Sequence, residues 1–77
     1  MNKIEFHRLI DEIIESPPAT ITGNEILSEI AGWDSLTVVA FLAAFDKQFG
    51  APPPPQALAA CRTVADLAAL AGDKLAD

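Results

Sequence analysis

Two proline clusters divide this chain of 77 residues and limit the length of the helices that it can form. The first cluster is Pro17-Pro18, and the second is the run "APPPP" at residues 51–55. Proline lacks the amide hydrogen that a helix interior requires, and it favours extended conformations in the residue before it. Helices are therefore expected between the clusters rather than across them, with residues 51–55 as a stiff extended connector.

The segments between the prolines have the apolar spacing of amphipathic helices. In residues 2–15, apolar side chains recur three and four positions apart, charged side chains fall mostly on the other face, and Asn2 can cap the start. A second apolar stripe predicts a helix over residues 35–49. A last helix is expected after Thr63, a good N-cap residue with Asp66 three positions on.

The remaining segments complete the expected fold. The loop at residues 19–32 carries several large aliphatic residues, so it is expected to wrap over the core with a short helical turn near residues 25–30. Gly50 should end the second helix, residues 56–61 should form a short helix or turn, and the tail from Asp73 should be frayed. The predicted fold class is all-α, a small four-helix bundle of three main helices and one short helix. The core is expected to include Phe6, Leu9, Ile10, Ile13, Leu42, Phe45, Phe49, Val64 and Leu67.

The charge balance excludes several classes of partner. The formal net charge is −6, and the sequence pI is about 4.4. Nucleic acid is not expected as a partner, because contacts to phosphate need clustered Lys and Arg residues. No signal peptide is recognised, and no apolar run approaches the ~20 residues of a membrane span. We expect a complete, cytoplasmic protein that does not insert into membranes.

The residues that could support catalysis are few. His7 is the only histidine and Cys61 the only cysteine. A serine nucleophile needs a base within hydrogen-bond reach and a third group that orients the base, and one histidine on a charged helix makes this unpromising. Cys61 is expected to be a small half-buried residue rather than a reactive thiol. No glycine-rich phosphate loop or metal site is recognised, so the chain is not expected to be an enzyme.

The stretch "GWDSL" at residues 32–36 places a polar pair, Asp34-Ser35, at the start of the second helix. One interpretation is that Asp34 or Ser35 caps the helix by accepting hydrogen bonds from its free amides. The other is that Ser35 is a covalent attachment site, because the positive end of a helix favours a phosphate there. The physical chemistry of the segment favours neither interpretation over the other.

The chain resembles the acyl carrier protein family, which includes the peptidyl carrier domains. The resemblance covers essentially the whole chain, as a single carrier domain over residues 1–77, and rests on Asp34-Ser35-Leu36 with its flanks. It implies that 4′-phosphopantetheine is transferred from coenzyme A to Ser35, and that its thiol then carries an acyl or aminoacyl group as a thioester. It also implies that Asp34 helps to orient the magnesium and coenzyme of the transferase, and that Leu36 docks into partner pockets. Trp33 is expected to pack the loop onto the second helix.

The implied partners are a phosphopantetheinyl transferase, an acyl- or aminoacyl-loading ligase and a downstream transferase or synthase, acting on a monomeric carrier. The chain departs from the carriers of fatty acid synthesis, which have a row of carboxylates along the second helix. Here the expected outward positions include Thr37, Ala40 and Lys47, which with Trp33 and Leu36 are the predicted partner-recognition residues. A dedicated secondary-metabolite or cell-surface biosynthetic pathway is therefore expected. The alternatives are a non-covalent helical interaction module, in which Ser35 only caps its helix, and a small serine hydrolase.

Overall fold

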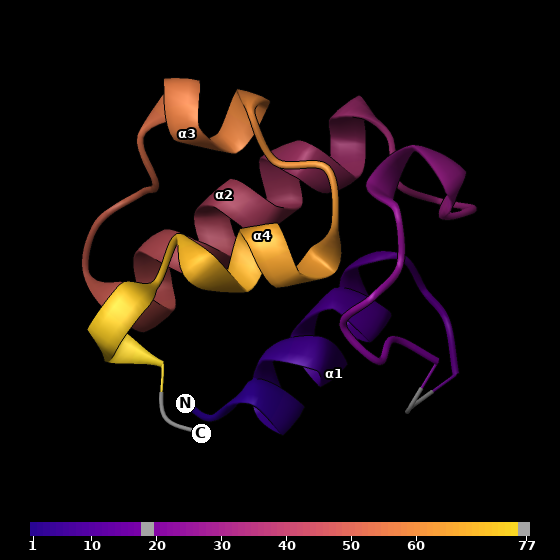
Figure 1. Cartoon of the computed structure of the whole chain (residues 1–77), viewed down its shortest axis with the longest axis horizontal. Helices are drawn as coiled ribbons and strands as arrows, with labels where there is room; N and C mark the ends of the chain where they lie inside the picture. The colour runs from indigo at the N-terminus through magenta and orange to yellow at the C-terminus, as the bar shows by residue number, and fades with distance from the viewer. Residues whose placement is uncertain (18–19, 76–77) are drawn as a thin grey trace.

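The computed structural model describes residues 1–17 and 20–75, and within them it confirms an all-α fold with four helices (Figure 1). The first two helices are long and the last two are short. The last helix was predicted to be one of three main helices, so it is shorter than expected. Ile26 and Thr63 form an isolated antiparallel β-bridge. The elements are α1 (Lys3–Ile13), η1 (Leu27–Glu29), α2 (Ser35–Phe49), α3 (Pro55–Ala59), α4 (Val64–Ala69) and η2 (Gly72–Lys74).

Helix α1 begins and ends through its own hydrogen bonds rather than at the prolines. Asn2 accepts a hydrogen bond from the amide of Glu5 at 2.8 Å, and the Glu5 carboxylate accepts one from the amide of Asn2 at 3.0 Å. At the other end, Glu15 adopts a left-handed conformation with φ 59°. The Ser16 amide then donates to the carbonyl of Asp11 at 2.9 Å, which closes the helix in a Schellman motif. The helix therefore stops at Ile13, two residues earlier than the apolar spacing predicted.

The other helix boundaries follow the expected residues closely. Gly50 closes α2 with φ 83°, and Thr63 caps α4 by accepting from the amide of Asp66 at 3.2 Å. The short helix expected at residues 56–61 is α3, which begins one residue earlier because Pro55 occupies its first turn. The extended proline connector therefore ends at Pro54, one residue earlier than predicted.

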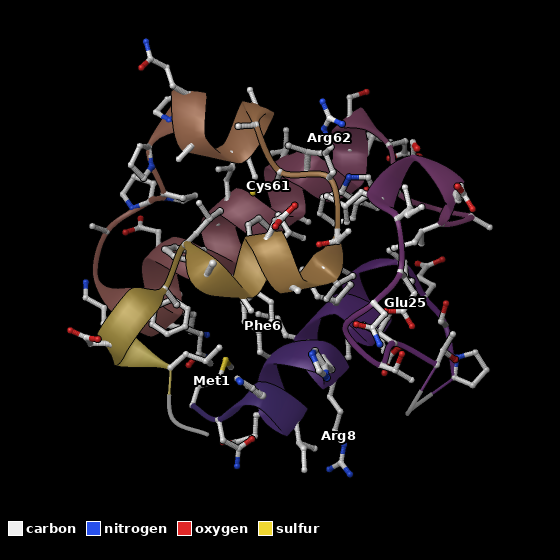
Figure 2. All side chains as sticks on the ribbon, viewed as in Figure 1. Met1, Phe6, Arg8, Glu25, Cys61 and Arg62 are labelled. Carbon is white, nitrogen blue, oxygen red and sulfur yellow. The ribbon has the colours of Figure 1, made fainter. Side chains whose placement is uncertain are left out.

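The centre of the core is an aromatic cluster on α1 and α2. Phe6 is fully buried and lies between α1 and α4 (Figure 2), and its ring meets that of Phe41 edge-on at 6.1 Å. Phe45 lies 5.7 Å from Phe41, and Phe49 lies 4.6 Å from Phe45, between ring centroids. This row anchors α2 along its length. The buried apolar core is Phe6, Ile10, Ile14, Ile21, Leu27, Phe41, Phe45, Val64, Leu67 and Ala71.

The predicted core list was wrong at two positions and incomplete at others. Leu9 and Leu42 are only half-buried and do not belong to the core cluster. Ile13 and Phe49 are partly buried and pack against it. Phe41, in contrast, is 0% exposed and was missing from the list. Helical spacing defines a broad apolar stripe, whereas the position of the neighbouring helices decides which residues of that stripe are buried.

The loop before α2 is tied to the helices by hydrogen bonds. The carboxylate of Asp11, which is only 2% exposed, accepts from the amide of Ile21 at 2.9 Å. The bridge beside Thr63 adds bonds from Leu27 N to Arg62 O at 2.8 Å and from Val64 N to Glu25 O at 3.1 Å. Element η1 confirms the short helical turn expected near residues 25–30. The loop therefore packs over the core, as its aliphatic residues predicted.

The tail is more ordered than the sequence indicated. Lys74 lies in the 3-10 turn η2, and its Nζ donates to the carbonyl oxygen of Phe49 at 3.0 Å. Leu75 packs against the core. The prediction of a frayed end from Asp73 is therefore wrong for residues 73–75, because a cation bonds to a free carbonyl at the C-terminal end of α2. Residues 76 and 77 lie outside the described residues.

Across residues 1–17 and 20–75, none of the helices has the length and hydrophobicity that crossing a membrane requires.

Candidate functional site

The N-terminus of α2 is capped by Asp34 and not by Ser35. The Asp34 side chain accepts a hydrogen bond from the amide of Thr37 at 3.0 Å. The hydroxyl of Thr37 in turn accepts from the Asp34 amide at 2.7 Å and donates to the Asp34 carbonyl at 2.8 Å. These bonds form a reciprocal capping box. The interpretation in which Ser35 caps the helix is therefore wrong.

Ser35 is the first residue of α2, and its side chain is exposed. Among the described residues, no hydrogen bond engages its hydroxyl. The amides of Ser35 and Leu36 lie in the first turn, where no intrahelical acceptor exists. They lie at the positive end of a helix of 15 residues. A free hydroxyl beside unpaired amides fits a phosphodiester group on Ser35.

Gly32 and Trp33 set the direction from which the chain enters α2. Gly32 has φ 91°, and a Cβ atom there would lie 3.1 Å from the carbonyl oxygen of Ile14. Glycine is thus favoured both by the conformation and by the close approach to the end of α1. Trp33 is half-buried, and its ring meets Phe41 edge-on at 6.0 Å. The tryptophan packs the loop onto α2, as predicted.

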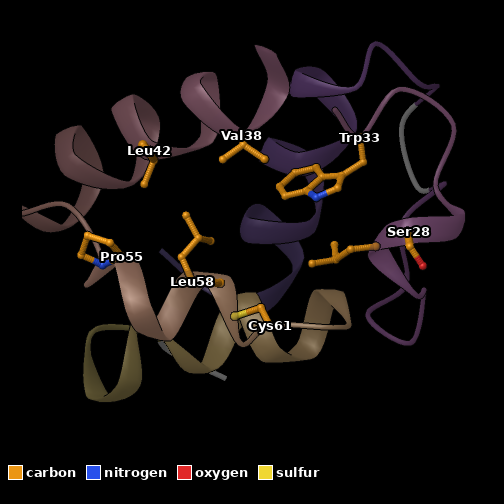
Figure 3. A pocket seen from close by; sticks show the side chains of 9 residues that line it. Ser28, Trp33, Val38, Leu42, Pro55, Leu58 and Cys61 are labelled. Carbon is orange, nitrogen blue, oxygen red and sulfur yellow. The ribbon is translucent and has the colours of Figure 1, made fainter. Parts of the chain in front are cut away.

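An apolar cavity of about 490 Å³ lies between α2 and α3 (Figure 3). Trp33, Val38 and Leu42 face it from one side, and Leu58 and Cys61 from the other. Burial, followed by the nearby Asp66 charge, raises the pKa of the Cys61 thiol. The thiol also donates to the carbonyl of Ala57 at 3.3 Å. Cys61 is therefore half-buried, as the sequence predicted.

A second hollow, of about 340 Å³, lies where the end of α1 meets the start of α2. Asp34 and Leu36, the two neighbours of Ser35, both line it, together with Glu15 and Ala40. The lining of this hollow is therefore more polar than the lining of the cavity between α2 and α3. Its position brings Glu15, two residues after the end of α1, to the surface that surrounds the start of α2.

The predicted partner-recognition residues do not form one uniform surface. Leu36 is 80% exposed, and Ala40 and Lys47 are also exposed. Thr37 and Trp33 are half-buried, and the Thr37 hydroxyl is occupied by the cap.

Val39 is not among the predicted partner-recognition residues, yet its side chain is 64% exposed. Val39 follows Leu36 by three residues, so the two lie on the same helix face, and this spacing could have indicated that Val39 is exposed.

The remaining candidate groups are His7 and the side chains that could hold a metal ion. His7 is half-buried, and its imidazole lies against Gly23, where a Cβ atom would come within 3.1 Å of Nε2. In the part of the chain that the structure describes, no three His, Cys, Asp or Glu side chains are grouped so as to hold a metal ion.

Comparison with known proteins identifies the family. A family model described as a phosphopantetheine attachment site matches residues 5–71. No curated protein and no solved structure gave a significant match to the chain. The match covers most of α1 and the whole of α2, α3 and α4, including the N-terminus of α2. The chain therefore belongs to the phosphopantetheine-binding family of acyl and peptidyl carrier proteins, whose members bind 4′-phosphopantetheine covalently.

Proposed function

We propose that Ser35 is the residue to which 4′-phosphopantetheine is attached, and that the chain carries acyl or aminoacyl groups. The observation that carries the proposal is the division of roles at the start of α2. Asp34 and Thr37 make the cap, so the exposed hydroxyl of Ser35 has no structural function among the described residues. A hydroxyl that is exposed and free of hydrogen bonds can be reached by an enzyme without disturbing the helix.

The residues around Ser35 have distinct proposed roles. The unpaired amides of the first turn stabilise the negative charge of a phosphodiester on the Ser35 oxygen. The exposed side chain of Leu36 contacts the enzyme that reaches Ser35. Asp34 holds the helix start and also presents a carboxylate to the magnesium and coenzyme of the transferase. When bound, the group supplies a flexible arm with a terminal thiol for thioester formation, which raises the effective concentration of cargo at a partner's active site.

The proposed partners are a phosphopantetheinyl transferase, a loading ligase and a downstream transferase or synthase. The carrier itself is proposed to be a non-enzymatic, cytoplasmic monomer with a single domain over residues 1–77. A dedicated secondary-metabolite or cell-surface pathway is supported by the absence of acidic residues between Ser35 and Phe45. The apolar lining of the cavity between α2 and α3 supports cargo with an apolar chain.

The test is the intact mass of the protein after incubation with coenzyme A, Mg²⁺ and a promiscuous phosphopantetheinyl transferase. Wild type and Ser28→Ala should each gain one phosphopantetheine, and Ser35→Ala should gain none. Ser28 is a matched control because it is also an exposed serine, near the α2–α3 cavity.

If folded wild type stays unmodified while a known carrier reacts in parallel, the proposal fails. The chain would then be better described as a non-covalent interaction module. A gain of mass in Ser35→Ala would show that the attachment residue lies elsewhere.

A further inference from the structure

The connector between α2 and α3 carries consecutive prolines at residues 52–55, which the proposed function does not use. It runs along an outer edge of the molecule from the end of α2 to the start of α3 (Figure 1). Pro54 has φ −59° and ψ 132°, which is the polyproline II conformation. Residues 52–54 lie in no helix or strand, and ring closure restricts φ of every proline to this region. The connector is therefore a short, stiff polyproline II segment.

The burial of the prolines follows the period of this conformation. Polyproline II has three residues per turn, so Pro52 and Pro55 lie on one edge, while Pro53 and Pro54 occupy the other two. Pro55 keeps this register although it begins α3, because its ring direction is set by its own φ and by the ψ of Pro54. Pro53 is buried, whereas the other three prolines are exposed. One edge thus anchors the segment to the protein, and the other two edges present proline rings to solvent.

The chemistry of the exposed edges is apolar and rich in hydrogen-bond acceptors. Proline has no amide hydrogen, so residues 52–55 can only accept hydrogen bonds through their backbone. No described residue donates to the carbonyl of Ala51 or Pro52, while the Pro54 carbonyl accepts from the Leu58 amide at 3.0 Å. Residues 48–61 contain no charged residue, in a chain whose formal net charge is −6. A complementary surface must therefore offer flat apolar contact and hydrogen-bond donors, and tryptophan and tyrosine side chains combine the two.

We propose that this segment is a docking site for a partner protein whose groove is lined by tryptophan and tyrosine side chains. The rings of Pro52 and Pro55 pack between the aromatic side chains of the groove, and an indole or phenol group donates to the free carbonyl of Pro52. The segment is already extended and is anchored by Pro53, so little conformational entropy is lost on binding. The inference goes beyond the proposed function, because it does not require that Ser35 is modified.

The docking site lies at the end of α2 that is remote from Ser35. Helix α2 has 15 residues and begins at Ser35, so its length separates Ser35 from the connector by about 20 Å. Figure 3 shows the same separation, with Trp33 and Pro55 at opposite ends of the cavity between α2 and α3. A partner that binds the prolines therefore leaves the start of α2 open. Such a contact holds the carrier close to the partner and raises the effective concentration of Ser35 at a second site on it.

The first arm of the test uses domains with aromatic grooves as probes. Titration calorimetry would measure the Kd of an SH3, a WW and an EVH1 domain for wild type, for the double variant Pro52→Ala/Pro55→Ala and for Pro17→Ala. Pro17 is an exposed proline outside the connector and is the matched control. At least one domain should bind wild type and Pro17→Ala with a Kd below about 1 mM. The double variant should bind that domain at least about tenfold more weakly.

Circular dichroism melts should show the double variant folded, because both of its substituted side chains are exposed. If it is unfolded, Pro52→Ala alone replaces it in the comparison, since this change keeps the buried Pro53 and the first residue of α3. The single variant should also bind more weakly than wild type. The proposal is overturned if none of the three domains binds wild type saturably, or if the folded variant binds as tightly as wild type.

The second arm locates the bound domain by the amide chemical shifts of ¹⁵N-labelled wild type. The amides of Ala51 and Gln56, which border the prolines, should shift during the titration, and those of Ser35 and Leu36 should stay unchanged. Shifts at Leu36 and Val39 in place of the connector would show that the domain binds the exposed face of α2, and would overturn the proposal. A wild type that binds at the prolines but takes up no phosphopantetheine would leave this inference standing while the proposed function fails.

Discussion

The ring of Trp33 meets the ring of Phe41 edge-on, with centroids 6.0 Å apart and an interplanar angle of 66°. Phe41 in turn meets Phe6 of α1 and Phe45 of α2. The residue two positions before Ser35 is therefore held by the centre of the core. This contact fixes where the loop ends and α2 begins, and so it fixes the position of the exposed hydroxyl.

Replacing Phe41 with alanine should destabilise the protein by about 3–5 kcal/mol, because the side chain is large, fully buried and in contact with three aromatic rings. Such a loss could unfold so small a domain. Urea denaturation followed by circular dichroism would measure it. Leu42→Ala is the control, and it should cost clearly less because Leu42 is half-buried and borders a cavity. Similar losses for the two variants would contradict the revised core.

Replacing Asp34 with alanine should cost about 0.5–2 kcal/mol of stability, since the capping oxygen for the Thr37 amide is removed. Ser35→Ala should change stability by only a few tenths of a kcal/mol, because that hydroxyl makes no cap. Thermal melts of the two variants would compare these effects. Asp34→Asn keeps a good capping side chain and should melt like wild type. A larger loss for Ser35→Ala than for Asp34→Ala would place the cap on the serine after all.

Replacing Gly32 with alanine should destabilise the loop that leads into α2. The residue has φ 91°, and the added Cβ would lie 3.1 Å from the Ile14 carbonyl oxygen. The expected cost is about 1–3 kcal/mol, from left-handed strain together with the close contact. Gly50→Ala shares the positive φ, 83°, but has no atom within 4 Å of the new Cβ. Chemical denaturation should therefore show a smaller loss at Gly50 than at Gly32, and the reverse order would contradict the steric explanation.

The carboxylate of Glu25 makes the stability of the folded protein depend on pH in the acidic range. Partial desolvation alone would raise its pKa, but hydrogen bonds from the Thr22 amide, the Gly23 amide and the Thr22 hydroxyl outweigh this and lower it from 4.5 to about 2. The folded protein therefore holds this proton less tightly than the unfolded chain does. The stabilisation is present above about pH 4.5 and is lost as the pH falls toward about 2.

Melting temperatures of wild type and Glu25→Gln between pH 7 and pH 2.5 would measure this dependence. The difference between the two proteins should be largest near neutral pH and should shrink in acid. The Asp66 carboxylate contributes in the same direction, because the amides of Arg62 and Thr63 lower its pKa. A constant difference across this range would exclude the charge of Glu25 as the cause.

The sequence predicted the helices and their ends wherever the determining interaction is local. Asn2, Thr63 and Gly50 act on backbone groups within a few residues of themselves, so their roles could be inferred from spacing alone. The helical period likewise identified the apolar stripes. The exception is the end of α1, where Glu15 takes a left-handed conformation that glycine usually adopts. Nothing in the local pattern marked this glutamate as the residue that ends the helix.

The sequence by itself determined that Ser35 begins the second helix in a small acidic, all-helical chain, since helical period, capping residues and prolines are properties of neighbouring positions. Only the tertiary structure decided that Phe41 rather than Leu42 lies in the core. It also brought Lys74 to the carbonyl of Phe49, and Glu15 to the hollow beside Ser35. These outcomes depend on how the helices and loop pack against one another, because burial and long-range contacts arise between segments that are distant in the sequence.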